Sequence, residues 1–324
     1  MKWLWKVSLP VIRLVHISSL KKYFSCQNFL PGNAFIIPLK SVLKYPSSWL
    51  YVDNKIFKER MPEYNILELT QFAHKLADKS GEVIRKYYRN FGSIEAKGDL
   101  SPVTIADQEA EKAIRFLIKQ HYCDHGIQGE EFGLENENSK LRWVIDPIDG
   151  TSSFMIGRPI FGTLIALSYE GRPIIGLIDQ PITGERWIGY EKENQTKQSF
   201  LNGKSINTRS CEKLANAVIA TSGPNYFSKD KLSKFNEIAG KALYKIYGGD
   251  CYNYALLAMG TVDVVVESGL KPHDFMALSA VVEGAGGMAT DWQGKPLDIN
   301  SNGDVLCSGD KKVHEEVLKM LNGN

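Results

Sequence analysis

The clearest hydrophobic pattern in the chain begins at Asn65. Apolar and small residues recur from there at alternating spacings of three and four, which is the period of an amphipathic helix. Asn65 and Glu68 stand at the spacing of a capping box, a common helix start. The same period begins again near Thr104 and stops before Gly126. The pattern therefore predicts two amphipathic helices at the start of the folded body.

Short apolar runs separated by turn residues follow these helices, and such runs predict strands. The pair Asn202-Gly203 between two of the runs predicts a hairpin. After about residue 208 strands alternate with helices, which favours a layered α/β half. The expected strands cover residues 143–145, 161–167, 174–178, 186–190, 200–201, 205–206, 218–220, 243–246, 262–266, 288–290 and 305–307, and the later helices cover 229–241, 251–258, 275–283 and 313–321.

The change of pattern predicts two domains behind an N-terminal extension. We expect an α+β domain over residues 61–208 and an α/β domain over residues 209–324. Residues 1–60 mix Trp, Leu, Ile and Lys without a sustained period. Three interpretations of this extension stay open: a targeting leader, a membrane-surface anchor, or a mis-assigned start upstream of a true one at Met61. Transit peptides are usually rich in Arg and Ser, so this Lys-rich stretch favours the mis-assigned start.

Composition and charge exclude several classes of protein. Hydrophobic residues make up 43% of the chain and charged residues 23%, values typical of globular proteins rather than of collagens or disordered chains. The formal net charge is +2, and ten Lys or Arg lie in residues 1–60 against two acids, so the body is mildly acidic. This balance argues against a nucleic-acid partner. Basic residues interrupt every long apolar run, so we expect no membrane span.

The five cysteines bear on the compartment. They are scattered along the chain and form no CxxC pair, so the pattern indicates neither a disulfide framework nor a structural zinc cluster. This is typical of a reducing compartment, and we expect a cytoplasmic location. The five are Cys26, Cys123, Cys211, Cys251 and Cys307.

Acidic residues gather at the ends of apolar runs. Glu130 and Glu131 follow one run, and Asp146 ends the next, with Asp149 three residues further on beyond Pro147. A turn at the proline can direct both aspartates to one point. Like charges that close together require a cation, and ligands that are all oxygen select a hard ion such as Mg2+.

The residues after Asp149 suit an anion. Gly150, Thr151 and Ser152 offer backbone N–H and hydroxyl groups at an expected helix start. The segment is therefore interpreted as a metal site beside a phosphate-binding turn. The alternative is an ordinary turn in which the acids only cap backbone N–H groups.

Three separated motifs occur in order along the chain. They are Glu130-Glu131, then Asp146-Pro147-Ile148-Asp149-Gly150-Thr151, then His273-Asp274 ahead of a helix of small residues ending at Glu283-Gly284-Ala285-Gly286-Gly287. Together they resemble the inositol monophosphatase family of metal-dependent phosphomonoesterases, over residues 65–321. Further segments, at 161–167, 178–181, 249–252, 270–274 and 291–297, resemble the histidinol-phosphatase branch of that family.

The resemblance implies a fold and a metal site. The fold is α/β, or α+β in some schemes: a layered αβαβα sandwich of the inositol monophosphatase and fructose-1,6-bisphosphatase type, in which the domain over residues 61–208 binds metal. The site implied holds two or three Mg2+ ions. Its ligands are the side chains of Glu130, Asp146, Asp149 and Asp274 and the backbone carbonyl of Ile148.

The resemblance also implies catalytic roles. Asp107 and Thr151 orient the attacking water, with Glu130 as the third catalytic residue, and Lys97 matches a family lysine in a loop near the metals. Asp107 has the alternative role of a first-turn helix acid stabilised by the helix macrodipole, and Lys97 that of an exposed loop base.

Substrate-binding residues are expected mainly in the C-terminal half. Glu267 matches a family position that contacts the alcohol portion of the substrate, and a carboxylate there would meet the α-ammonium group of histidinol phosphate. Asp250 adds an acid where inositol-directed relatives tend to carry a small neutral residue. Asp179 and Gln180 are weaker candidates. For these acids the alternative is a surface carboxylate at a strand end.

These residues predict a Mg2+-dependent phosphomonoesterase that hydrolyses L-histidinol phosphate to L-histidinol and phosphate, a step of histidine biosynthesis. The alternatives are an inositol-1-monophosphatase or a broad sugar phosphatase. An alternative of another class is an RNA- and transcription-associated binding protein with residual phosphatase activity. The expected partners are a small phosphate monoester and, by family analogy, a second copy of the chain.

Overall fold

The computed structural model describes residues 64–90, 95–96, 102–103, 105–192 and 196–323. The extension over residues 1–60 and the candidate Lys97 therefore lie outside the described residues. Ile66–Ile118 and Asp124–Asn324 form one compact unit. The division of this unit into two domains at residue 208 stays a prediction.

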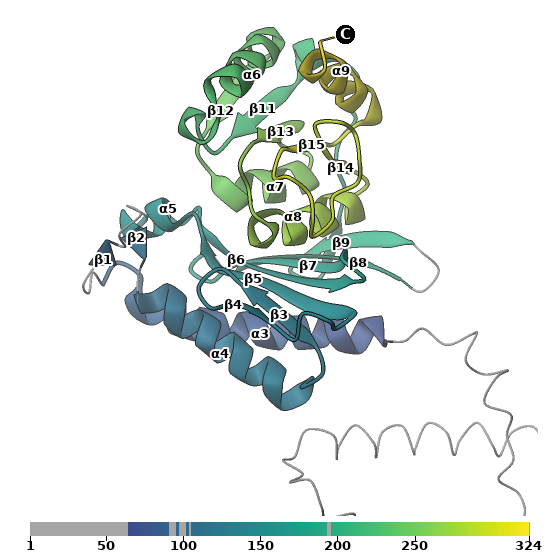
Figure 1. Cartoon of the computed structure of the whole chain (residues 1–324). Coiled ribbons are helices and arrows are strands. Elements are labelled where there is room, and N and C mark those ends of the chain that lie inside the picture. The colour runs from purple at the N-terminus through teal and green to yellow at the C-terminus, as the bar shows by residue number, and fades with distance from the viewer. Residues whose placement is uncertain (1–63, 91–94, 97–101, 104, 193–195, 324) are drawn as a thin grey trace, which may run out of the picture. The chain divides into compact units, whose positions relative to one another are not determined.

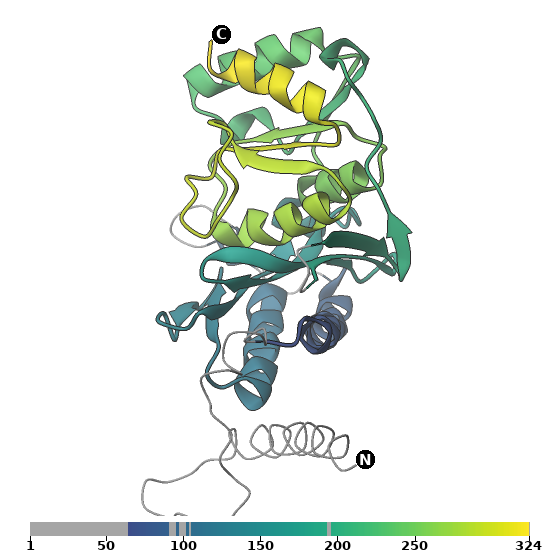
Figure 2. The ribbon, with the colours of Figure 1, turned by 90° about the vertical axis from the view of Figure 1, so that its right-hand side faces the viewer.

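Helix and sheet layers alternate through this unit (Figures 1 and 2). Helices α3 and α4 cover one face of an eight-stranded sheet, and α7 and α8 separate that sheet from a five-stranded one, whose outer face carries α6 and α9. The expected αβαβα sandwich is thus confirmed. The helices are α3 (Ile66–Tyr87), α4 (Ile105–His121), α5 (Thr151–Met155), α6 (Lys229–Lys241), α7 (Asp250–Ala258), α8 (Pro272–Gly284) and α9 (Lys311–Leu321), with short 3-10 helices η3 (Leu214–Asn216) and η4 (Pro224–Tyr226).

The eight-stranded sheet has the order β10-β9-β8-β7-β6-β5-β3-β4. Its neighbours are antiparallel except β3 and β5, which run parallel. The hairpin predicted at Asn202-Gly203 is present, because β9 and β10 pair on either side of it. The strands are β3 (Gly126–Gly129), β4 (Gly133–Glu135), β5 (Leu141–Asp149), β6 (Gly162–Tyr169), β7 (Arg172–Gln180), β8 (Glu185–Glu191), β9 (Lys197–Leu201) and β10 (Lys204–Ile206), beside a separate pair β1 (Glu95–Ala96) and β2 (Pro102–Val103).

The five-stranded sheet has the order β12-β11-β13-β15-β14. Strand β11 runs parallel to β12 and β13, whereas β15 runs antiparallel to both β13 and β14. The segment in which strands and helices alternate along the sequence therefore forms a sheet with both parallel and antiparallel neighbours. The strands are β11 (Val218–Thr221), β12 (Tyr244–Tyr247), β13 (Val264–Glu267), β14 (Met288–Asp291) and β15 (Val305–Ser308).

Helix α8 packs directly on the larger sheet, chiefly on β7 and β8. A side chain at Gly176 of β7 would place its Cβ 2.1 Å from the carbonyl oxygen of Ala277 in α8. Only glycine permits that approach. Close packing here fixes the position of the helix that carries Asp274.

The start of α8 differs from the sequence prediction of 275–283. The helix begins at Pro272, because proline suits the first helical position and the Asp274 carboxylate accepts a hydrogen bond from the Lys271 backbone N–H at 2.6 Å. His273 and Asp274 thus lie within the first turn and not ahead of the helix. Among the helices in the described part of the chain, none combines the length and apolar character needed to cross a bilayer.

Candidate active site

Strand β5 carries two carboxylates into the interior. The pairing register with β6 shifts between Asp146 and Asp149, which marks a bulge that redirects the strand end. The backbone N–H of Ile148 donates to Oδ1 of Asp146 at 3.0 Å, and that of Cys251 donates to Oδ2 of Asp149 at 2.6 Å. The spacing predicted a turn at Pro147, but strand β5 continues through Pro147 to Asp149, and the bulge within it brings the two aspartates together.

Asp274 reaches the same place from the first turn of α8. One carboxylate oxygen each of Asp146, Asp149 and Asp274 lies within 4.8 Å of the others, a spacing that could hold a metal ion. A second group meets the same limit and is formed by Asp107 at the start of α4 with Glu130 and Glu131. We call these six residues the carboxylate cluster: Asp107, Glu130, Glu131, Asp146, Asp149 and Asp274.

The two groups interact electrostatically. Burial first, and then the charge of Glu130, raises the pKa of Asp146 well above its usual range. Burial also raises the pKa of Asp149, with Asp250 as the next cause, and the pKa of Asp274. Partial burial raises the pKa of Glu130 as well, against the lowering effect of His273. The anionic form of each of these carboxylates is therefore less stable in the folded protein than it is in water.

This donor set fits divalent cations of the hard type. All six side chains offer oxygen, and Asp107 and Asp146 are each only 2% exposed. Buried charges of one sign are costly unless an opposite charge compensates them, and Mg2+ binds through one or two carboxylates together with water and phosphate oxygens. The cluster can therefore hold a hard divalent cation such as magnesium.

A buried glutamate positions the turn that bears Glu130 and Glu131. The carboxylate of Glu111 accepts hydrogen bonds from the backbone N–H groups of Glu131 at 2.8 Å and Phe132 at 3.2 Å, and from Nε of Arg115 at 2.7 Å. A Cβ on Gly129 would lie 2.0 Å from Oε1 of Glu111. Glycine is therefore required at 129 for this acid to reach the turn.

Two residues of the site were not predicted from the sequence: Glu131 as a cluster member and Glu111 as its support. Only Glu130 of the two adjacent glutamates was assigned to the site, because the family resemblance implied a role for that residue alone. Strand β3 ends at Gly129, and the alternation of side chains along a strand no longer applies beyond it. The adjacent acids just past a strand end were the available signal.

The predicted phosphate-binding residues follow Asp149 directly. Gly150 has a left-handed φ of 85° and precedes the single turn of α5. The hydroxyl of Thr151 donates to the carbonyl of Ile148 at 3.2 Å. The structure thus brings Gly150, Thr151 and Ser152 beside the cluster, and their contact with phosphate stays a prediction, as does ligation by the carbonyl of Ile148.

The two acids predicted to bind substrate occupy different positions. Glu267, at the end of β13, is 1% exposed and accepts hydrogen bonds from the hydroxyls of Thr221 at 3.0 Å and Ser222 at 2.8 Å. Burial raises the pKa of Glu267 to about 7. Asp250 is half-buried, accepts from the hydroxyl of Ser153 at 3.4 Å, and raises the pKa of the neighbouring Asp149. Asp250 therefore borders the cluster, with Glu267 held in the interior.

The structure does not bring Asp179 and Gln180 to the cluster. Oδ1 of Asp179 accepts from Nε of Arg186 at 2.7 Å, on the sheet face next to α3. The amide of Gln180 donates to the carbonyl of Phe161 and accepts from the backbone N–H of Ile182. Both side chains stabilise the end of β7 and the turn after it.

Comparison with known proteins identifies the family and several similar chains. The inositol monophosphatase family matches residues 65–323. The bifunctional phosphatase IMPL2, chloroplastic, of Arabidopsis thaliana is 48% identical over 278 residues, which are 82% of this chain and 79% of that protein. A histidinol-phosphatase of Chlorobaculum parvum is 34% identical over 240 residues, covering 74% and 91% of the two chains. A solved inositol monophosphatase from Zymomonas mobilis superposes with a TM-score of 0.73 at 44% identity, covering 80% and 99%.

Proposed function

The chain belongs to the inositol monophosphatase family, and on this premise we propose that it is a Mg2+-dependent phosphomonoesterase whose substrate is L-histidinol phosphate. Family membership makes it a phosphatase for phosphate monoesters. The observation that supports the metal-dependent chemistry is the carboxylate cluster, whose six acids come from β5, α4, α8 and the turn after β3. The substrate is the narrower part of the proposal.

In the proposed reaction the oxygen of water bonds to phosphorus as the ester P–O bond breaks, and one proton of that water ends on the alcohol oxygen. When bound, Mg2+ supplies Lewis acidity for the phosphoryl group and the attacking water. Asp107 accepts a hydrogen bond from that water, and the hydroxyl of Thr151 helps to orient it. The proposed ligands are the side chains of Glu130, Asp146, Asp149 and Asp274 and the carbonyl of Ile148.

Asp250 supports an amino-alcohol substrate. Its carboxylate borders the cluster, next to Asp149 and Ser153, where the α-ammonium group of histidinol phosphate can donate to it. Such a charge-assisted hydrogen bond contributes about 1.5–3 kcal/mol, which equals roughly 10–100-fold in affinity. The carboxylate of Glu267 is enclosed by Thr221 and Ser222. In this proposal Glu267 therefore adds negative potential and orients the segment at the end of β11, while Asp250 contacts the α-ammonium group.

The deciding assay compares three substrates at one Mg2+ concentration. Phosphate release is measured from L-histidinol phosphate, inositol 1-phosphate and fructose 1,6-bisphosphate, with an imidazolyl propyl phosphate that lacks the amine as the matched analogue. We expect the highest kcat/KM for L-histidinol phosphate, at least about tenfold above the analogue. Equal values for all substrates would reject the narrow specificity and leave a broad sugar phosphatase or inositol monophosphatase.

Two variants separate contact from support. Asp250→Asn should raise KM for L-histidinol phosphate about tenfold or more and leave KM for the amine-free analogue unchanged. Asp230→Asn, an exposed change on α6, is its matched control and should alter neither. An Asp250→Asn enzyme with wild-type KM for both substrates would remove Asp250 from the binding pocket.

Three earlier expectations stay predictions. The Arabidopsis relative is named chloroplastic, so the cytoplasmic location is not confirmed for this chain. The homodimer rests on family analogy. The alternative of an RNA-associated binding protein is also untested, although the cluster of acids supports catalysis.

A further inference from the structure

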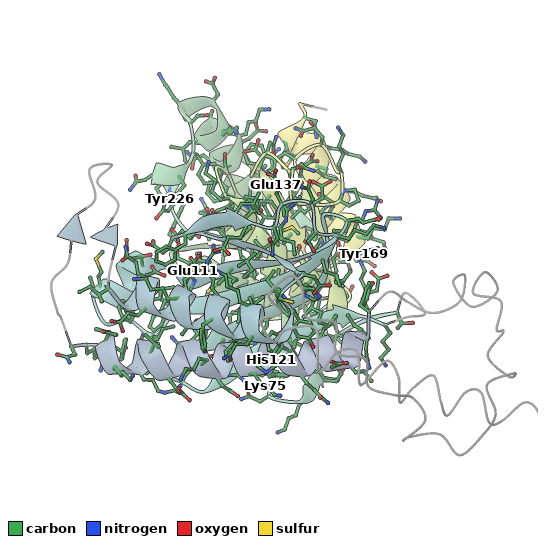
Figure 3. All side chains as sticks on the ribbon, turned by 60° about the horizontal axis from the view of Figure 1, so that its bottom comes forward. Lys75, Glu111, His121, Glu137, Tyr169 and Tyr226 are labelled. Atoms are coloured by element: carbon green, nitrogen blue, oxygen red, sulfur yellow. The ribbon has the colours of Figure 1, made fainter. Side chains whose placement is uncertain are left out.

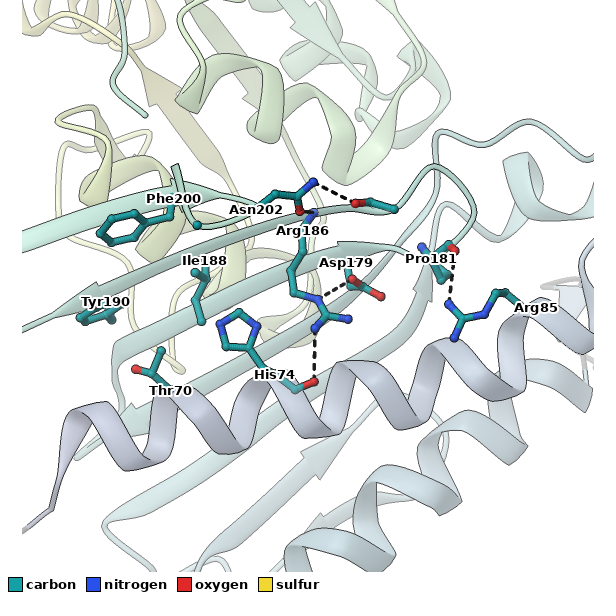
Figure 4. Close-up of a pocket in the computed structure, with 12 residues that line it drawn as sticks. Thr70, His74, Arg85, Asp179, Pro181, Arg186, Ile188, Tyr190, Phe200 and Asn202 are labelled. Carbon is teal, nitrogen blue, oxygen red and sulfur yellow. Dashed lines mark hydrogen bonds and ion pairs between the residues drawn. The ribbon is translucent and has the colours of Figure 1, made fainter. Parts of the chain in front are cut away.

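Two buried hydroxyl groups join helix α3 to the eight-stranded sheet. The helix packs on the face of this sheet that lies opposite α8 (Figures 1 and 4). In this layer the hydroxyl of Ser80 in α3 lies 3.1 Å from the hydroxyl of Thr163 in β6, and both residues are fully buried. Strand β6 pairs with β5, which carries Asp146 and Asp149. Nothing in the proposed phosphatase chemistry uses either hydroxyl.

Thr163 stands opposite the bulge of β5. Two residues of β5, Pro147 and Ile148, lie opposite this single residue of β6. A bulge of this kind interrupts the ladder of backbone hydrogen bonds between the two strands. Oγ1 of Thr163 donates to the carbonyl of Pro147 at 2.7 Å. Since Pro147 is buried and a buried carbonyl without a donor is costly, this hydroxyl stabilises the bulge.

The direction of the hydrogen bonds follows from the chemistry of a hydroxyl, which has one proton to donate and two lone pairs to accept. Thr163 uses its proton on the carbonyl of Pro147, so the proton between the two hydroxyls comes from Ser80. The hydrogen bonds therefore run from α3 through β6 to the bulge of β5. The bulge is thus held by a helix as well as by the neighbouring strand.

The bulge lies between two acids of the carboxylate cluster. Asp146 and Asp149 flank it and bring carboxylate oxygens within 4.8 Å of one another. Like charges at this spacing repel each other, which favours a strand end that moves the two acids apart. The hydrogen bond from Thr163 opposes that movement, because it fixes the backbone at Pro147, between the acids. The same stretch of backbone carries the carbonyl of Ile148, a proposed ligand.

We propose that Ser80 and Thr163 are positioning residues that set the Mg2+ affinity of the carboxylate cluster by holding the carbonyl of Pro147. The inference rests on the proposed function, because it takes the cluster to be the Mg2+ site. Neither hydroxyl contacts metal or substrate. Groups that hydrogen-bond behind the ligands of a metal commonly contribute roughly 10–100-fold to its affinity.

Isothermal titration calorimetry of the full chain with MgCl2 tests this role without any substrate. Thr163→Val keeps the shape of the side chain and removes the hydroxyl, so we expect the Kd for Mg2+ to rise about tenfold or more. Thr163→Ser keeps the hydroxyl and should restore a Kd close to that of the unaltered chain. A Kd unchanged by Thr163→Val would overturn this inference alone. Absence of Mg2+ binding by the unaltered chain would overturn both the inference and the metal dependence in the proposed function.

Two further variants separate positioning from general stability. Thr290 of β14, in the smaller sheet, is also buried, and its Oγ1 donates to the carbonyl of Asp291 at 2.8 Å. Thr290→Val is therefore the matched control: it should lower the unfolding midpoint and leave the Kd for Mg2+ unchanged. Ser80→Ala should weaken Mg2+ binding less than Thr163→Val, because Pro147 keeps its donor, and it provides the test if Thr163→Val does not fold. Equal losses of Mg2+ affinity in Thr290→Val and Thr163→Val, or unchanged affinity in Ser80→Ala, would refute the positioning role of the hydroxyl pair.

Discussion

Replacing Gly129 by alanine tests how the site is supported. The new Cβ would lie 2.0 Å from Oε1 of Glu111, a distance that no real contact allows, and Glu111 is fully buried. The glutamate must therefore move away from Arg115 and from the backbone N–H of Glu131, its partners at 2.7 and 2.8 Å. Breaking a buried ion pair costs about 3–5 kcal/mol.

That cost has two measurable consequences. Because 1 kcal/mol shifts the unfolding midpoint of a domain this large by roughly 2–4 °C, we expect Gly129→Ala to unfold about 10 °C below the unaltered protein. Displacement of the turn by about 1 Å should lower kcat about 10²-fold, because the turn carries Glu130 and Glu131. Differential scanning calorimetry and phosphate release measure the two effects.

Gly240→Ala is the matched control for this experiment. A Cβ there meets no atom within 4 Å, and residue 240 lies inside α6, where alanine is favoured over glycine by roughly 0.5–1 kcal/mol. This variant should be as stable as the unaltered protein or slightly more so, with unchanged kcat. If Gly129→Ala matched Gly240→Ala in midpoint and in kcat, Glu111 would not support the turn.

Three further outcomes follow from the site and the core. Asp146→Asn should lower kcat by about 10³-fold or more, since metal chemistry contributes several kcal/mol. The unfolding midpoint measured without metal should stay the same or rise, because one repelling charge is gone. A lowered unfolding midpoint without metal would contradict this expectation. Chelation with EDTA should stop phosphate release and lower the midpoint, and added Mg2+ should restore both; activity that survives chelation would remove the metal from the mechanism. Burial lowers the pKa of His314 from 6.5 to about 4 in the folded chain. As the pH falls from 6.5 towards 4, the unfolded chain therefore binds a proton at this histidine before the folded chain does. The free energy of unfolding falls by about 3 kcal/mol over that range, and this part of the stability is fully present only above pH 6.5. Urea unfolding of His314→Gln should show a smaller loss between these pH values, and an equal loss would show that another group is responsible.

The elements that could be predicted from the sequence are those in which apolar residues recur on one face over many residues. Helix α3 runs from Ile66 to Tyr87 as its apolar stripe indicated. Helix α8 has no such stripe, because it is buried on nearly every side from Phe275 to Val282, so its first turn was misplaced. Strand β4 was missed because Gly133–Glu135 contains no apolar run. The order of strands in each sheet depends on contacts between distant segments, which periodicity does not encode.

The site was predictable to the extent that its acids stand in recognisable motifs. Asp146, Asp149 and Asp274 meet as the resemblance implied. Asp179 was assigned to the substrate, yet its side chain lies at the α3 face and pairs with Arg186. A shift of one residue along a strand reverses the face that a side chain occupies, and the sequence alone does not reveal which face of β7 meets which helix.

Side chains surround the ribbon of the described chain (Figure 3), so a phosphate ester has to pass between side chains to reach the carboxylate cluster. Asp274 belongs to α8, and α8 rests on Gly176 with no room for even a methyl group between them. The helix therefore ties the second half of the chain to the sheet that bears Asp146 and Asp149. Separation of α8 from this sheet would break that close packing, so we expect Asp146, Asp149 and Asp274 to keep their relative positions when a phosphate ester binds.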